Sequence, residues 1–201
     1  MSIKVTIRKE GEAARSDRPA APGQPCLYPD DLFFRNGAGR FWTCARTRPR
    51  WEKKFAQWLH DRRREYFLPV FRRETVSGRK RQSRLLPLFP GFVFVTGDLS
   101  KKDFAASGCV AYVLKPKGER GAAQLECELR NVWRGLESGL YVAPVQNLAV
   151  GEACRIVRGP LQGVAARFER LGRAGRLLLQ VEMMGGGIAV EVSADEIEVG
   201  S

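Results

Sequence analysis

The 201-residue sequence has little of what most catalytic and metal sites require. It contains a single histidine, which excludes a histidine-rich metal centre and argues against a catalytic triad. Its five cysteines are far apart and odd in number, and no two form a CxxC pair. This usage indicates reduced thiols, not a disulfide framework or a zinc site. We therefore expect neither a metal nor a cofactor. The cysteines are Cys26, Cys44, Cys109, Cys127 and Cys154.

Long hydrophobic runs are also missing. No apolar stretch approaches the roughly 20 residues that span a bilayer, and the N-terminus lacks the apolar region of a signal peptide. A cytoplasmic protein without membrane association is therefore expected. The chain is 44% hydrophobic and 28% charged and has eleven phenylalanines, so it can build hydrophobic cores and is not disordered throughout. Its length suits two small domains.

The net charge of +12 is concentrated in the middle of the chain. Residues 1–39 carry +1, residues 40–140 carry +12 and residues 141–201 carry −1. Most of the excess lies in residues 41–84, which hold fourteen basic and four acidic residues. Charge acquired for solubility alone would be spread more evenly. The middle segment is therefore expected to lie near a polyanion, with nucleic acid as the first candidate.

The pattern of apolar residues divides the first 140 residues into an extension and a mixed domain. Residues 1–39 are expected to be a largely flexible extension, because residues 1–25 are rich in Pro, Ala and Gly with little apolar periodicity. Within the extension, Leu32, Phe33 and Phe34 are candidates to dock on the folded domain. Residues 40–140 alternate between strand-like and helix-like patterns, which predicts helices packed on a mainly antiparallel sheet. Strands are predicted at residues 41–47, 66–75, 85–95 and 109–114, and helices at 50–64, near 97–106 and at 123–137.

The C-terminal part loses the helical period. After an expected linker at residues 141–149, short β-rich runs separated by turns predict five strands within residues 150–201. So small a sheet removes its exposed edges by closing into a barrel. The predicted fold class is α+β, with an N-terminal antiparallel sheet flanked by helices and a small C-terminal β-barrel.

The most specific string of the sequence is PLFPGFVFV at residues 87–95. In a strand, Phe92 and Phe94 share one face and the two valines take the other. Only one face of such a sheet looks into a helix-covered core. Two phenylalanines on the opposite face would form an exposed apolar patch of the kind that marks a binding site. The alternative is a strand buried on both faces, and the pattern alone does not decide between them.

A second string, RGPLQG at residues 158–163, lies between two predicted strands of the barrel. Gly159 and Pro160 suit a tight turn, and Gly163 permits a positive φ or close packing. The string is compatible with a simple turn between two strands and also with the signature of a known domain.

Together these strings resemble the NusG-like family of transcription elongation and antitermination factors. The resemblance covers roughly residues 41–201 and includes Trp42, Glu52 and the two strings. It implies an NGN-like domain over residues 40–140 and an SH3-like KOW barrel over residues 150–201. PLFP and the basic stretch before it are closer to specialised paralogues such as RfaH. Leu161 stands where the KOW module usually has Phe.

The resemblance implies a protein without catalytic activity. In the family, the N-terminal domain binds the clamp helices of RNA polymerase through an aromatic patch, near upstream or non-template DNA. The KOW domain recruits a ribosomal protein or a termination factor. A monomer is expected. Carried onto this sequence, the polymerase-binding residues are Phe89, Phe92, Phe94 and Tyr112. The nucleic-acid-proximal residues are Arg46, Arg48, Arg50, Arg79, Lys80, Arg81, Arg84, Lys101 and Lys102. The KOW motif is Gly159, Pro160, Leu161 and Gly163.

Two other functions compete with this one. An RNA- or ribosome-binding KOW protein would also be basic, but its charge would lie on the barrel, and here the barrel segment carries −1. A nuclease or nucleotidyltransferase would need clustered carboxylates for metal ions. In the middle segment Asp61, Asp98 and Asp103 lie in unrelated predicted elements, which argues against an enzyme.

Overall fold

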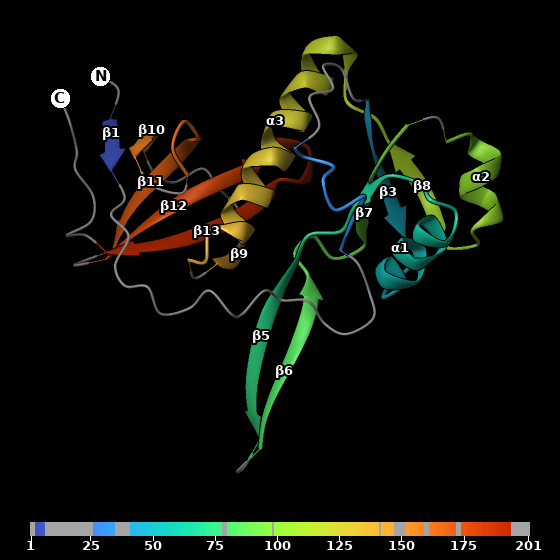
Figure 1. Cartoon of the computed structure of the whole chain (residues 1–201), viewed down its shortest axis with the longest axis horizontal. Helices are drawn as coiled ribbons and strands as arrows, with labels where there is room; N and C mark the ends of the chain where they lie inside the picture. Colours follow the sequence, from blue (N-terminus) through green and yellow to red (C-terminus); the bar gives the residue numbers. More distant parts are fainter. Residues whose placement is uncertain are drawn as a thin grey trace. The chain divides into compact units, whose positions relative to one another are not determined.

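The computed structural model of the protein divides into two compact units. Figure 1 shows the chain and its element labels. One unit is Arg18–Glu126, and the other combines Met1–Asp17 with Cys127–Ser201. The division falls within the helix α3 (Gly118–Glu137), which begins earlier than its predicted start at residue 123. The described residues are 3–6, 26–34, 41–77, 80–97, 99–140, 142–146, 152–158, 161–171 and 174–193.

A five-stranded antiparallel sheet forms the centre of the unit Arg18–Glu126. The strand order is β2-β4-β7-β3-β8, so the two strands that carry the predicted site, β7 and β3, are neighbours. This confirms the predicted α+β class. The strands are β2 (Leu27–Tyr28), β3 (Trp42–Thr47), β4 (Tyr66–Phe67), β7 (Phe92–Thr96) and β8 (Val110–Leu114).

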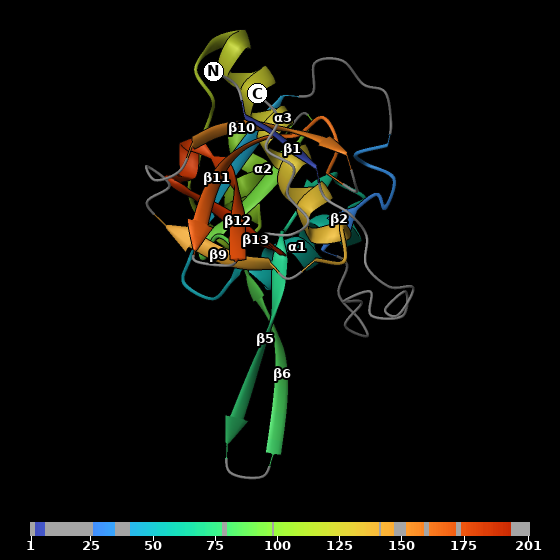
Figure 2. The same ribbon diagram turned by 90° about the vertical axis from the view of Figure 1, so that its left-hand side faces the viewer.

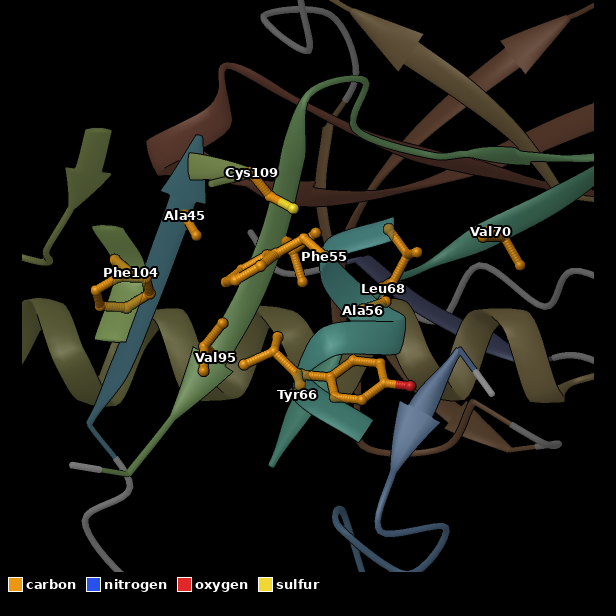
Figure 3. Packing of buried hydrophobic residues seen from close by; sticks show 11 residues of the cluster. Ala45, Phe55, Ala56, Tyr66, Leu68, Val70, Val95, Phe104 and Cys109 are labelled. Carbon is orange, nitrogen blue, oxygen red and sulfur yellow. The ribbon is translucent and has the colours of Figure 1, made fainter. Parts of the chain in front are cut away.

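Two helices, α1 (Glu52–Asp61) and α2 (Lys101–Ala106), share a core with one face of this sheet. Phe55 and Leu59 of α1 are fully buried in this core, as their helical spacing predicts. Figure 3 shows Phe55 among the side chains of this cluster. Ser100 caps α2 in a reciprocal pair with Asp103. The hydrogen bonds from Ser100 lower the pKa of the Asp103 carboxyl.

The segment predicted as one long strand, residues 85–95, is two strands joined by a bend. β6 (Lys80–Pro87) ends before the bend, and β7 begins after it. Pro87 and Pro90 have no amide hydrogen for a sheet, and Gly91 has a φ of +84°, so the chain turns here. β6 pairs with β5 (Val70–Ser77) in a separate two-stranded ribbon. Figures 1 and 2 show this ribbon extending from the unit's sheet.

Part of the expected flexible extension is structured. β2 pairs with β4, and beyond it Leu32 and Phe33 are 0% and 2% exposed. The ring of Phe33 stacks on Trp42 at a centroid distance of 5.7 Å and meets Phe67 edge-on at 5.1 Å. Leu32 and Phe33 therefore dock, as their apolar character suggests, because they complete a core built by distant strands, whereas Phe34 is 71% exposed. Residues 7–25 and 35–40 lie outside the described residues.

The second unit contains a six-stranded sheet with the order β1-β10-β11-β12-β13-β9. The strands β10 to β13 match the predicted β-rich runs. Two further strands were not predicted. β1 lies in the segment expected to be a flexible extension, and β9 lies in the segment expected to be a linker, yet both pair with strands of this sheet. The predicted strand at residues 197–199 lies outside the described residues. The strands are β1 (Ile3–Thr6), β9 (Val142–Gln146), β10 (Glu152–Arg158), β11 (Ala165–Leu171), β12 (Ala174–Val181) and β13 (Gly186–Ser193).

The C-terminal half of α3 packs closely on this second sheet. Leu129 and Val132 of the helix are fully buried. A Cβ placed on Gly135 would lie 2.6 Å from Cδ1 of Ile188 on β13 and 2.9 Å from Cδ1 of Leu179 on β12. The absence of a side chain at Gly135 therefore permits the approach of helix and sheet.

Candidate functional site

Three predicted site residues form one row across the first sheet. Arg46 on β3 lies directly opposite Phe92 on β7 and, on its other side, opposite Tyr112 on β8. Directly opposed residues share a face of the sheet. The Arg46 guanidinium lies over the Phe92 ring, 4.4 Å from its centroid, in cation–π geometry. Tyr112 is 53% exposed, and Phe92 and Arg46 are half-buried. We call these three residues the aromatic–arginine row.

A bend next to the row is held from three directions. The Gly91 amide donates a buried hydrogen bond of 2.6 Å to Oε1 of Glu52 on α1. The Gly91 carbonyl accepts one of 2.8 Å from the Thr47 amide. The Arg46 Nη1 donates one of 3.1 Å to the Pro90 carbonyl. These three hydrogen bonds tie α1 and β3 to the bend at Gly91. They thereby determine the position of Phe92, the first residue of β7.

Gly91 is required by more than its backbone conformation. Its φ of +84° lies in the left-handed region, and a Cβ there would lie 2.8 Å from both Cζ and Nη1 of Arg46. The guanidinium therefore occupies the space that a side chain at position 91 would take. The Pro-Gly sequence and Arg46 form one packing unit.

The expectation of an exposed Phe92/Phe94 pair is wrong at Phe94. Phe94 is 0% exposed, and Phe89 is 6% exposed. The Phe94 ring meets Phe89 edge-on at 5.7 Å and Phe67 at 6.5 Å. The β7 strand is therefore buried on both faces beyond its first residue, because Phe67 and the neighbouring phenylalanines cover the second face. Phe92 and Tyr112 keep the exposure that contact with a partner needs.

Sequence reasoning missed a set of aromatic–cation contacts along α1. Trp51 and Trp58 share the helical spacing of the buried Phe55 and Leu59 but are only half-buried. Lys54 Nζ lies 4.0 Å from the ring centroid of Trp51, and the Arg62 guanidinium lies 4.1 Å from that of Trp58. The sequence contains the signal for these contacts, because each cation follows its tryptophan by three or four residues, a spacing that brings side chains together on a helix. The stacked cations make this side of α1 basic and aromatic together.

Apart from Arg46 on β3, the predicted nucleic-acid-proximal residues that the structure describes lie in the loop before α1, at the start of α2 and on β6. Arg48 and Arg50 are exposed beside the start of α1, and Arg48 lies 5.4 Å from the Trp51 ring centroid. Lys101 and Lys102 are exposed in the first turn of α2, where a helix dipole disfavours cations. Arg84 is exposed on β6. Lys80 and Arg81 lie on the same strand, and Arg79 lies outside the described residues.

The residues predicted as a KOW motif lie between β10 and β11 in the sequence. Leu161 is 0% exposed, so it packs inward and does not present its side chain to solvent. The Gly163 amide donates a hydrogen bond to the Ile156 carbonyl at 2.7 Å, with a φ of +83° at Gly163. Arg134 on α3 donates from Nη2 to the Gln162 carbonyl at 2.6 Å. Gly159 and Pro160 lie outside the described residues.

Two of the thiols, those of Cys44 and Cys154, are poorly suited to nucleophilic chemistry. Burial raises the pKa of Cys44 to about 12 and that of Cys154 to about 11. Within the described part of the chain, no three His, Cys, Asp or Glu side chains are grouped so as to hold a metal ion. No helix in that part has the length and apolar character needed to cross a bilayer.

Comparison with known proteins bears on the first unit. Residues 40–119 match the family model described as transcription termination factor nusG. A solved structure described as "Domain interaction in Thermotoga maritima NusG" is 18% identical and covers 79% of this chain and 96% of its own. Its TM-score of 0.39 is too low to support a residue-by-residue correspondence. No curated protein matches the chain.

The matched segment contains the aromatic–arginine row, the bend at Gly91, α1 and the β5–β6 ribbon. Over residues 40–119, this helix-flanked antiparallel sheet is therefore similar in sequence to the NusG family of transcription factors.

Proposed function

We propose that this protein is a non-catalytic factor that binds RNA polymerase and acts in transcription elongation or antitermination. The observation that carries the proposal is the aromatic–arginine row. Its two aromatic side chains and one guanidinium are available on a single sheet face, held in place by the bonds at Gly91. The NusG family match supports a role in transcription.

The row suits a helical partner surface. Phe92 and Tyr112 supply apolar area, worth about 25 cal/mol for each Å² removed from water. Arg46 lies between them and adds a charged donor that favours a partner with a carboxylate nearby. We assign the clamp helices of RNA polymerase as this partner. Phe89 and Phe94 support the row from the core.

Nucleic acid is the second proposed partner. Arg48, Arg50 and the cations stacked on Trp51 and Trp58 give one side of α1 a salt-sensitive affinity for phosphates. Upstream or non-template DNA next to the bound polymerase is the proposed ligand. The C-terminal sheet would recruit a further protein, a ribosomal protein or a termination factor, through exposed Gln162 and Gly163. PLFP and the basic ribbon favour a specialised, RfaH-like paralogue.

The test is capture of RNA polymerase by a tagged protein. The double variant F92S/Y112S should lose capture at low salt and keep its circular dichroism spectrum, because neither side chain is fully buried. F41S is the matched control, since Phe41 is an exposed aromatic residue of the same unit, at 66%. Full capture by F92S/Y112S would overturn the docking surface and favour the ribosome-binding alternative.

A further inference from the structure

The β5–β6 ribbon carries a charge arrangement that its own folding does not explain. Arg73 on β5 lies directly opposite Arg84 on β6. Directly opposed like charges destabilise an antiparallel pair. Both side chains are exposed, and among the described residues neither forms an ion pair. The ribbon thus retains a repulsion that a bound polyanion would relieve.

The rest of the ribbon has the same character. Residues 70–87 contain six Lys or Arg and one acidic residue, Glu74. Arg72 is also exposed and, by register, lies on the opposite face from Arg73. Arg84 donates from Nη2 to Oε1 of Gln82 at 3.2 Å, which orients it along the strand. The ribbon therefore presents arginines on both of its faces.

The geometry points to duplex DNA as the ligand, and we infer that the ribbon enters its major groove. Two strands of eight residues make a ribbon about 25 Å long, and the major groove of B-form DNA is wide enough for a two-stranded ribbon. Both walls of a groove are lined by phosphates, which matches cations on both faces. The ribbon forms its own sheet, so it reaches the ligand without neighbouring strands.

Other nucleic acids fit less well. The ribbon has a single aromatic residue, the half-buried Phe71 at its base, and none in residues 72–87, so it lacks the row of stacking platforms on which single-strand binders depend. The major groove of A-form RNA is too narrow for a ribbon. The contacts are to phosphates, and therefore sequence-independent. This inference rests on the proposed nucleic-acid role and specifies the ligand of one element.

The experiment measures anisotropy of a labelled 24-base-pair DNA duplex of mixed sequence with the full chain. R73Q/R84Q should bind about tenfold more weakly or worse at 0.1 M salt, and the slope of log K against log salt should fall by about 2. K115Q/K117Q is the matched control, because it removes two exposed charges of the same unit elsewhere. It should bind at least fivefold more tightly than R73Q/R84Q.

A second arm uses the RNA duplex of the same sequence and one DNA strand alone. The wild-type protein should prefer the DNA duplex to both, and R73Q/R84Q should lose that preference. Equal affinities of R73Q/R84Q and K115Q/K117Q, or equal binding of DNA and RNA duplexes, would overturn the inference. Polymerase capture by R73Q/R84Q should match the wild type. Failure of capture by the wild type would overturn the proposed function and leave the anisotropy comparison readable.

Discussion

Glu52 and Gly91 lie 39 residues apart and are joined by a buried hydrogen bond of 2.6 Å from the glycine amide to the carboxylate. Glu52 is only 6% exposed, although it lies in the first turn of α1. The carboxylate thus satisfies an amide that the bend would otherwise bury without a partner. The bond links the helix to the start of the strand that carries Phe92.

Removing the Glu52 carboxylate should destabilise the fold. Glu52→Ala leaves the buried Gly91 amide without an acceptor, which we expect to lower the free energy of unfolding by about 2–3 kcal/mol. Urea denaturation followed by tryptophan fluorescence measures this. Glu119→Gln is the control, because Glu119 is exposed in the first turn of α3 and reports only the helix-dipole effect. Equal small effects of both changes would contradict the role assigned to the bond.

Gly91→Ala should cost more than Gly97→Ala. Both glycines have a positive φ, +84° and +89°, so an alanine suffers similar backbone strain of about 1–2 kcal/mol at each. Only at Gly91 does the new Cβ meet a neighbour, since nothing lies within 4 Å at Gly97. The Arg46 guanidinium would have to swing away and lose its hydrogen bond to the Pro90 carbonyl and its place over the Phe92 ring. The extra cost should disappear in an Arg46→Ala background. Thermal melts of the wild type, the two glycine variants, Arg46→Ala and the Arg46→Ala/Gly91→Ala double variant give this comparison, and an excess that persists without Arg46 would disprove the clash.

Phe94 and Phe92 should differ sharply when each is truncated. Phe94→Ala empties a fully buried site and should cost about 3–5 kcal/mol, whereas half-buried Phe92 should cost about 1–2 kcal/mol. Conversely, only Phe92→Ala should weaken polymerase capture at equal amounts of folded protein. Urea unfolding midpoints test the statement about stability. Capture assays at urea concentrations below the unfolding transition test the statement about polymerase binding. A stable Phe94→Ala protein would mean that the second face of β7 is open in solution.

Gly135→Ala should destabilise the second unit despite the higher helix propensity of alanine. The gain in propensity is about 1 kcal/mol, whereas overpacking against Ile188 and Leu179 costs about 1–3 kcal/mol. Ile188→Val removes the nearest methyl group and should reduce the cost. Gly121→Ala on the same helix meets only Pro116, at 3.5 Å, and should not destabilise. A Gly135→Ala protein more stable than the wild type would rule out the close packing.

Cys127 should be the fastest of the described cysteines to react with a maleimide. It is exposed on α3, whereas Cys44 and Cys109 are buried. Because burial raises the pKa of Cys44 to about 12, raising the pH to 9 leaves that thiol protonated and unreactive. Mass spectrometry after brief labelling identifies the site, and Cys127→Ser should remove most of the early label. Early labelling of Cys44 would contradict the buried environment.

The sequence by itself determined the local elements of the first unit. Apolar residues at helical spacing located α1, because Phe55 and Leu59 must share one face of any helix there. The string PLFPGFVFV stood out in the sequence as a candidate binding segment. The prediction of one continuous strand over residues 85–95 was wrong, because the chain bends between Pro87 and Phe92. The basic excess in residues 41–84 follows from composition alone, and its cations lie mainly on the ribbon and on or next to α1.

Only the tertiary structure decided which of these residues are exposed. A two-residue period places Phe92 and Phe94 on the same face but cannot tell how far that face is covered. Phe67 and Phe89 pack on Phe94, and Phe33, from a segment expected to be flexible, packs in turn on Phe67. β1 and β9 likewise form strands because distant partners supply their hydrogen bonds. Local pattern determines which way a side chain points, whereas burial depends on residues far away in sequence that only the folded chain brings into contact.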